Sequence, residues 1–381
     1  MYTIVGTSSL HDIWGDFIVY RNLVPADHRL PEISALRKFL SLQSSTLPRK
    51  TDPDYALVVA EQLRQARRLD LPGAALKRLV FIGDTRLLDA TAFQNLCTAG
   101  GWPGWAFIGR DEMGAERADV VEASVYASNR WSALPDFIAF LQKRGFGLDE
   151  QTALVIDMDK TTIGARGRND KVVDEARLEG VRLTVQGLLG DQFNEDAFRV
   201  VYHELNHPLY HAFTADNQDY LAYICLMLGT NLFDFPVLLQ DIQNSSMRSF
   251  FDFIQQVQLR QSELPSAGLA AIHDQVWRLV QEGDPTPFKA FRYNEYLATA
   301  TRFGISAIET VEAALSNRIL VTEEVRQAAG DLGARGALVF GLSDKPDEAS
   351  LPSPEQAQRG MQPLHRLKTL CAGEDKERQL S

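Results

Sequence analysis

The residues best suited to chemistry in this sequence follow a short apolar run at 153–156. The run ends in Asp157, and Asp159 and Thr161 follow at alternate positions in the pattern Asp-x-Asp-x-Thr. Open parallel sheets bind their ligands at the carboxyl ends of their strands, which is where these side chains would lie. Two carboxylates at such a strand end are suited to binding a metal ion and to nucleophilic attack. Taken alone, either aspartate could equally be a turn residue or a helix cap.

Two further apolar runs are followed by polar residues in the same way. One ends in Asp84, with Asp89 shortly after it, and the other, at 337–341, leads to Ser343 and Lys345. Because the carboxyl ends of parallel strands meet at one edge of a sheet, we expect these residues to lie near the first pair of aspartates. The alternative interpretation is turn chemistry for Asp84 and Ser343, and a solvated loop position for Lys345.

The elements around these motifs alternate between helices and buried strands. This indicates an α/β fold with a Rossmann-like, doubly wound parallel sheet. Strands are expected at 79–82, 105–108, 153–156 and 337–340, with a final short strand at 363–366, and helices at 53–70, 90–98, 134–143 and 324–332. Residues 1–49 give no clear pattern.

Between these parts, the strand alternation gives way to long amphipathic stretches, which predicts an inserted, all-helical domain. Its helices are expected at 172–189, 195–204, 219–228, 246–261, 269–281 and 288–301. The domains that we expect are 1–169 and 320–381, which together form the sheet domain, and 170–319, which forms the helical insert. The many large apolar residues of the insert are interpreted as a helical core, with a roomy apolar cavity as the alternative.

Composition narrows the classes of function. The 381 residues suffice for two or three domains, or for one domain with a large insertion, and 45% of them are hydrophobic, which is ample for a large core. A formal net charge of −11 argues against non-specific binding to nucleic acid or to anionic membranes. No apolar run reaches the ~20 residues of a membrane span, and the amino terminus lacks the features of a signal peptide. Three scattered cysteines favour a reducing compartment, so we expect a cytoplasmic protein.

Four segments resemble the motifs of the haloacid dehalogenase-like (HAD) superfamily. In the order of that family they are Asp157-x-Asp159-x-Thr161, the apolar strand that ends at Ser343, Lys50 just before a helix, and Gly83-Asp84 followed by Asp89. In this chain the third and fourth motifs precede the first and second, which indicates a circular permutation. The helical insert falls between the first and second motifs, where the family commonly has a cap domain. The resemblance covers the α/β parts of the chain.

The resemblance implies a hydrolase that works through a phosphorylated aspartate. Asp157 would attack phosphorus, and Asp159 would protonate the leaving group and then activate the water. Mg²⁺ would be bound by Asp157, the backbone carbonyl of Asp159 and Asp84. Asp89 would be a further ligand or a residue that orients the ligands.

The remaining motif residues, and Lys345 in the polar loop at the second motif, would contact the phosphate or hold the loop beside it. Ser343 would hydrogen-bond a phosphoryl oxygen, and Lys50 would balance charge between the nucleophile and the phosphoryl group. Thr161 would hold the loop after the strand beside the substrate, and Lys345 would assist in binding the phosphate. For Lys50, a solvated surface lysine is the alternative interpretation. The expected substrate is a small or lipid-like phosphate ester, with no nucleic-acid partner and no stable membrane insertion.

A competing metal motif lies in the insert. His203-Glu204-Leu205-Asn206-His207 matches H-E-x-x-H, in which two histidines on one helix face bind zinc and the glutamate acts as general base. His211 could be a third ligand. Pro208 directly follows the motif, and proline disfavours helix at the residue before it. The zinc metallopeptidase therefore stays an alternative, as do roles of these side chains as a helix end or as substrate contacts.

Two other interpretations stay open. The chain could be a catalytically silent HAD-like binding module, in which the sheet is a scaffold and the helical insert binds a partner. The loop at 164–169 contains Arg166 and Arg168, which could meet an anionic substrate or could belong to a solvated linker.

Overall fold

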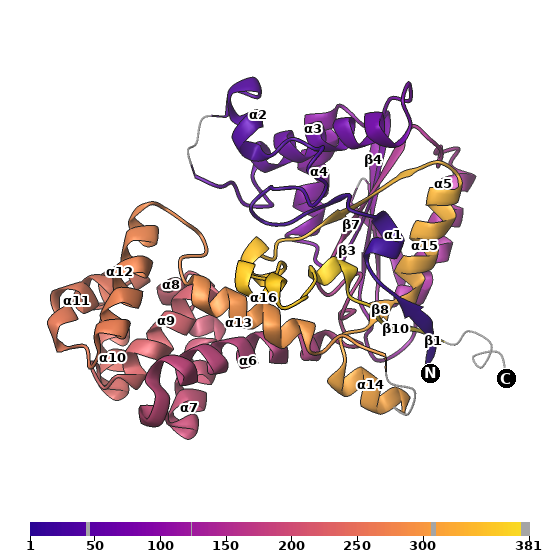
Figure 1. Ribbon diagram of the computed structural model, residues 1–381. Helices are drawn as coiled ribbons and strands as arrows, with labels where there is room; N and C mark the ends of the chain where they lie inside the picture. Colours follow the sequence, from indigo (N-terminus) through magenta and orange to yellow (C-terminus); the bar gives the residue numbers. More distant parts are fainter. Residues whose placement is uncertain (43–45, 123, 306–309, 375–381) are drawn as a thin grey trace. The chain divides into compact units, whose positions relative to one another are not determined.

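The computed structural model describes residues 1–42, 46–122, 124–305 and 310–374. The chain divides into two compact units (Figure 1). The α/β unit consists of residues 1–176 and 299–381, and the helical unit consists of residues 177–298.

The α/β unit contains all the strands of the described chain. They are β1 (Tyr2–Ser8), β2 (Ile18–Val19), β3 (Arg78–Gly83), β4 (Gly104–Gly109), β5 (Ala118–Glu122), β6 (Val125–Ser128), β7 (Thr152–Asp157), β8 (Val321–Thr322), β9 (Leu338–Leu342) and β10 (Thr369–Glu374). Its helices are α1 (His11–Trp14), α2 (Ile33–Phe39), α3 (Pro53–Asp70), α4 (Asp89–Gly100), α5 (Leu134–Lys143), α14 (Val311–Asn317), α15 (Glu323–Ala334) and α16 (Pro354–Gln358).

Seven of these strands form one sheet in the order β2-β9-β7-β3-β4-β6-β5. Every neighbouring pair is parallel except β5 with β6. Helix α3 packs against α4, and α15 packs against α5. Figure 1 shows these two pairs on opposite sides of the strands. The predicted α/β class is therefore confirmed, with a sheet that is mostly parallel.

The direction in which the chain winds through this sheet changes between β3 and β7. From β3 the chain runs through α4 to β4 and on to β6, whereas β7 lies on the other side of β3 and has β9 as its outer neighbour. Open α/β sheets bind ligands beyond the carboxyl ends of the strands at such a switch point. The topology alone thus places the expected site between the ends of these two strands.

A second, three-stranded sheet has the order β1-β10-β8. It joins the beginning of the chain to its end, because β1 pairs with β10 in antiparallel register. The final strand expected at 363–366 is wrong: residues 364–366 form a short 3-10 helix, and the last strand is β10. Pro363 has no N–H to donate to a strand ladder, and it begins this turn instead.

The helical unit holds its helices around one apolar core. It contains α7 (Glu195–Leu205), α8 (His211–Thr214), α9 (Gln218–Gly229), α10 (Phe235–Gln243), α11 (Phe250–Leu259) and α12 (Ala267–Gln281), with most of α6 (Asp170–Leu189) and α13 (Lys289–Ala300). Tyr223, Met227, Phe250 and Phe253 are buried in this core, which agrees with the interpretation of the large apolar residues as a helical core. Among the described helices, none combines the length and the apolar character that crossing a membrane requires.

Two details of these helices differ from the expectation. Helix α11 begins at Phe250 rather than at 246, because Ser249 and Asp252 form a reciprocal capping box that fixes the start. Helix α10 was not expected. It begins behind Asp234, whose side chain accepts a hydrogen bond from the backbone N–H of Val237.

A buried ion pair ties α9 to α13 within the helical unit. Asp219 accepts a hydrogen bond from the Nε of Arg292 (2.8 Å) and another from the backbone N–H of Phe288 (3.0 Å). We expect Asp219→Ala to lower the free energy of unfolding by about 3–5 kcal/mol, because it leaves the buried guanidinium without this partner. Urea denaturation measures the loss. Asp274→Ala, at an exposed position of α12, should stay within about 0.5 kcal/mol of the parent. A loss below about 1 kcal/mol for Asp219→Ala would contradict the expectation.

Candidate functional site

Two neighbouring strands bring Asp84 and Asp157 to the same edge of the sheet. Strand β7 ends at Asp157, and Asp84 directly follows β3, its parallel neighbour, with Ile82 opposite Ile156. All six residues of β7 are buried, because a central strand of a parallel sheet is covered on both faces. The apolar run therefore fixes the position of Asp157 at the switch point.

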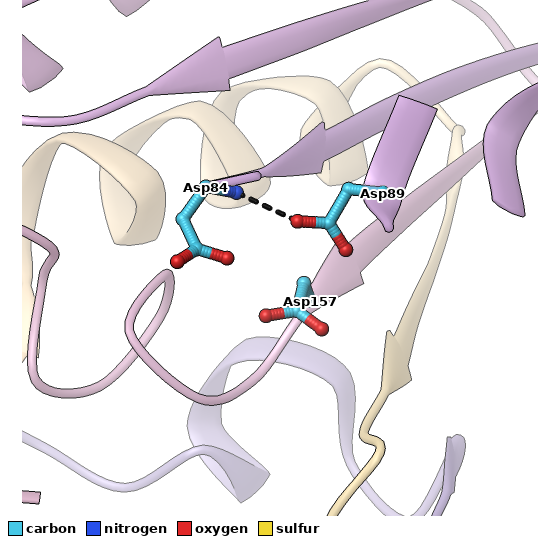
Figure 2. Close-up of side chains that lie close together, drawn as sticks. All are labelled: Asp84, Asp89 and Asp157. Atoms are coloured by element: carbon cyan, nitrogen blue, oxygen red, sulfur yellow. Dashed lines mark hydrogen bonds between the residues drawn. The ribbon is translucent and has the colours of Figure 1, made fainter. Parts of the chain in front are cut away.

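Asp84, Asp89 and Asp157 form a buried carboxylate cluster (Figure 2). One oxygen of each side chain lies within 4.8 Å of those of the other two. Figure 2 shows the three side chains gathered close together. Within the described parts of the chain, this is the one group of at least three His, Cys, Asp or Glu residues close enough to share a metal ion. The structure thus brings together three of the four predicted metal-binding residues.

Asp89 organises the turn after β3. Its Oδ2 accepts hydrogen bonds from the backbone N–H of Asp84 (3.0 Å), and from the N–H (2.8 Å) and hydroxyl (3.0 Å) of Thr85. The carboxylate lies so close to Gly83 that a Cβ there would be 2.6 Å from the Asp89 Cγ. Glycine is therefore required before Asp84. Because one oxygen of Asp89 is already occupied by three donors, this residue fits the role of orienting Asp84 better than that of a full metal ligand.

Lys50 lies inside the cluster. Its Nζ contacts Asp89 Oδ1 at 2.6 Å and Asp157 Oδ1 at 2.5 Å, and its side chain is buried. A turn just before α3 holds Lys50 in this position. In the turn, Asp52 Oδ2 accepts a hydrogen bond of 2.7 Å from the backbone N–H of Arg49. The alternative of a solvated surface lysine is therefore wrong.

Asp159 and Ser343 lie together beside the cluster. Leu342, the last residue of β9, lies opposite Asp157, so Ser343 comes one residue beyond the end of its strand. The Ser343 hydroxyl is 3.4 Å from Asp159 Oδ2, and it accepts a hydrogen bond of 3.0 Å from the backbone N–H of Lys345. The other oxygen of Asp159 is buried and has no hydrogen-bond partner among the described residues. Asp159 itself is not a member of the carboxylate cluster.

Lys345 is buried, and only 5% of the residue is exposed. Its backbone is fixed on both sides, because its N–H donates to Ser343 and its carbonyl accepts 3.1 Å from the N–H of Arg21. The alternative of a solvated loop lysine is therefore wrong for Lys345 as well.

The loop after β7 is closed by a residue that the motif interpretation did not single out. The hydroxyl of Thr162 donates 2.7 Å to the carbonyl of Asp157. Thr161, which was expected to hold this loop, is buried and leaves its own hydroxyl without a partner among the described residues. Lys160, directly before Thr161, has a φ of 59°, a left-handed conformation that is strained for a lysine. Strain of this kind is concentrated at functional sites.

Arg166 reaches the cluster from the same loop. Its Nε forms an ion pair with Asp84 Oδ2, and its side chain is 33% exposed. Arg168 points elsewhere and is buried between Asp111 and Glu324. The two arginines of the loop therefore have different surroundings, which their sequence context does not distinguish.

The carboxylates carry more negative charge than the nearby cations balance. Burial, and then the carboxylate of Asp89, raise the pKa of Asp84 to about 7. Burial raises the pKa of Asp157 well above its usual range; Lys50 opposes this effect, and the carboxylates of Asp89 and Asp84 add to it. Burial alone would lower the pKa of Lys50, but Asp157 and Asp89 raise it well above its usual value, so the ammonium stays charged. Such a cluster favours binding of a further cation.

The second candidate site, H-E-x-x-H, does not have the helical geometry that zinc peptidases use. Helix α7 ends at Leu205, and His207 has an extended backbone with φ −72° and ψ 143°. Its ring accepts from the backbone N–H of Leu209, and Glu204 accepts 2.7 Å from the hydroxyl of Tyr210. The proline after His207 thus ends the helix as expected. The two histidines therefore do not lie one turn apart on one helix.

The first site combines chemical groups that phosphoryl-transfer sites use. A buried carboxylate lies at a strand end, an ammonium is bound to it, and two more carboxylates face it across a distance that a metal ion spans. A further carboxylate with an unpartnered oxygen and a hydroxyl lie next to them. In comparisons with known proteins, no family model, no curated protein and no solved structure matches this chain.

Proposed function

We propose that this protein is a Mg²⁺-dependent HAD-like phosphatase that forms an aspartyl-phosphate on Asp157 from a small or lipid-like phosphate ester. The observation that carries the proposal is the cluster of Asp84, Asp89 and Asp157 at the switch point, with Lys50 bound to two of its members. The resemblance of the four sequence segments to the HAD motifs supports the same assignment.

Asp157 is the nucleophile of this proposal. Lys50 binds Oδ1, so the lone pairs of Oδ2 are available to attack phosphorus. The new bond joins Oδ2 to phosphorus, and the bond from phosphorus to the ester oxygen breaks. Water then attacks the same phosphorus, which releases inorganic phosphate and restores the carboxylate. Lys50 lowers the energy of both steps, because its charge lies next to the phosphoryl oxygens as negative charge builds up on them.

Asp159 is the proton donor to the departing ester oxygen and the base for the attacking water. Its unpartnered, buried Oδ1 is a position at which a proton can be exchanged, while Ser343 orients the other oxygen. A proton given to the leaving group in the first step is recovered from water in the second. Asp159 thus ends each turnover in the protonation state in which it began.

The residues present fit a magnesium ion. Mg²⁺ prefers carboxylate oxygens, and the cluster offers Asp84 and Asp157 as ligands, with Asp89 orienting Asp84 beside them. Burial first, and then the neighbouring carboxylates, raise the pKa values of Asp84 and Asp157, and a bound cation would offset both effects. When bound, Mg²⁺ would neutralise charge on the phosphoryl group and reduce its repulsion by the aspartates.

The helical unit would serve as the cap of this enzyme. The proposal follows the chain order, because the unit is inserted between β7 with its Asp-x-Asp pattern and β9 with Ser343. Caps in such enzymes select the substrate and exclude water during transfer. The order Lys50, Asp84, Asp157, Ser343 along the chain would make the core a circular permutation of the usual arrangement.

The proposal is tested by hydrolysis of p-nitrophenyl phosphate with and without Mg²⁺. We expect activity that EDTA abolishes and Mg²⁺ restores. In Asp84→Asn, the Mg²⁺ concentration for half-maximal activity should rise by about a hundredfold, because a ligand is lost. Asp119→Asn, an exposed aspartate of β5, should behave as the parent does. Activity that resists EDTA would exclude a magnesium-dependent reaction.

The same samples separate the alternatives. A zinc peptidase would contain tightly bound zinc in metal analysis and would lose it on replacement of His203. A silent binding module would hydrolyse none of a panel of phosphate esters and would bind no phosphate in the presence of Mg²⁺. The helix end at Leu205 argues against the first, and the intact, buried carboxylates argue against the second.

A further inference from the structure

The cation that contacts Asp84 in this structure is the side chain of Arg166. Its Nε forms an ion pair with Asp84 Oδ2, one of the carboxylates that the proposed function assigns to the metal. The Asp84 side chain is 6% exposed, whereas that of Arg166 is 33% exposed. Of the two partners, Arg166 is therefore the one that is accessible to solvent, and an incoming ion or phosphate can reach it.

The backbone of Arg166 is fixed, although its side chain reaches toward solvent. Its N–H donates 2.8 Å to the carbonyl of Lys160, and its own carbonyl accepts from the N–H of Asp111 at 2.9 Å and from the indole N–H of Trp131 at 3.3 Å. Gly167 follows with a φ of 80°, and a Cβ there would lie 1.9 Å from the carbonyl oxygen of Asp111. Any change in the contacts of Arg166 is therefore a rotation of its side chain.

We propose that the divalent cation displaces Arg166 from Asp84 and that the released guanidinium then binds the phosphoryl group of the substrate. This inference rests on the proposed function. A guanidinium and a metal ion that contact the same carboxylate compete for it. Their like charges also repel each other, because both would lie within bonding distance of the same oxygens. The planar guanidinium is suited to binding two oxygens of a phosphate at once. Arg166 would thus compete with the metal before substrate arrives and bind the substrate afterwards.

The neighbouring arginine provides an internal comparison. Arg168 donates to Asp111, to both oxygens of Glu324 and to the carbonyl of Ala372, and its side chain is only 1% exposed. These contacts hold the loop against α15 and β10. Arg168 is therefore a structural residue, and Arg166 is the arginine of this loop that has access to solvent.

The test measures binding and not turnover. Isothermal titration with Mg²⁺, and then with inorganic phosphate at saturating Mg²⁺, compares the parent with Arg166→Gln and Arg166→Lys. Arg166→Gln should bind Mg²⁺ about tenfold more tightly, because the competing ion pair is gone, and phosphate about tenfold more weakly. Arg166→Lys should keep the Mg²⁺ affinity of the parent, since it keeps the charge, but should also bind phosphate more weakly. Arg110→Gln removes an exposed arginine paired with Glu112 and should change neither affinity.

The opposite signs of the two effects make the inference specific. Equal or weaker Mg²⁺ binding by Arg166→Gln overturns the displacement, and unchanged phosphate binding overturns the role in substrate recognition. If the parent itself binds no Mg²⁺, or if Asp84→Asn binds it as well as the parent does, the proposed function fails first. Failure of this inference and failure of the proposed function therefore give different patterns of Mg²⁺ and phosphate binding.

Discussion

Asp157→Asn is expected to reduce the rate of phosphate ester hydrolysis by about 10⁴-fold or more, the size of effect seen when a catalytic nucleophile is lost. An asparagine has nearly the same shape, but its amide cannot attack phosphorus to form an acyl phosphate. The measurement is kcat for p-nitrophenyl phosphate at saturating Mg²⁺. Brief reaction of the parent followed by mass spectrometry should also find phosphate on the peptide that contains Asp157.

The control for this variant is Asp136→Asn, which makes the same chemical change at an exposed position in the first turn of α5. It should retain the activity of the parent. Because partial unfolding of Asp157→Asn would also lower its activity, the circular dichroism spectrum and the urea midpoint of the variant are measured alongside the assay. A folded Asp157→Asn that hydrolyses the ester as fast as its parent would disprove the nucleophile assignment.

Lys50→Gln should be the most destabilising substitution at the site, with a loss of about 3–5 kcal/mol in the free energy of unfolding. The buried ammonium contacts Asp157 and Asp89 at 2.5 and 2.6 Å, and its removal leaves these carboxylates facing each other without it. We also expect kcat to fall by about 10³-fold, because a positive charge next to the phosphoryl group is lost. Urea denaturation and steady-state kinetics measure the two effects separately.

Magnesium ions distinguish the electrostatic cause from simple loss of packing. If repulsion among the carboxylates destabilises Lys50→Gln, saturating Mg²⁺ should restore part of the stability, because the ion binds the folded state. Lys77→Gln changes an exposed lysine just before β3 and should stay within about 0.5 kcal/mol of the parent. A Lys50→Gln variant as stable as the parent would show that the cluster does not need this charge.

The strands that build the site were predictable because they are buried on both sides. In β3, β7 and β9 this produces nearly continuous apolar runs, and the sequence therefore marks both the strands and the polar residues at their ends. Strand β5 was missed because all five of its residues are exposed, so its sequence carries no apolar pattern. Strand β10 was missed because its sequence, Thr-Leu-Cys-Ala-Gly-Glu, contains only one β-branched residue and no aromatic residue.

At the site itself, residue type and position at a strand end were enough to place Asp84, Asp89 and Asp157 together. The contacts of Thr162 and Arg166 were not predictable in this way. They depend on the path of the loop after β7, which passes through a left-handed lysine and turns back to residues near Asp111. Such a path is set by tertiary contacts, and no local pattern in the sequence indicates it.

The pairing of the first strand with the last has a consequence for synthesis on the ribosome. Strand β1 needs β10, and β2 needs β9, so both amino-terminal strands leave the ribosome long before their partners exist. Until then their backbone edges stay open to wrong pairing with other chains. The α/β unit can therefore complete its folding only after β9 and β10 have been synthesised, whereas the helices of residues 177–298 make their contacts within one continuous stretch of nascent chain.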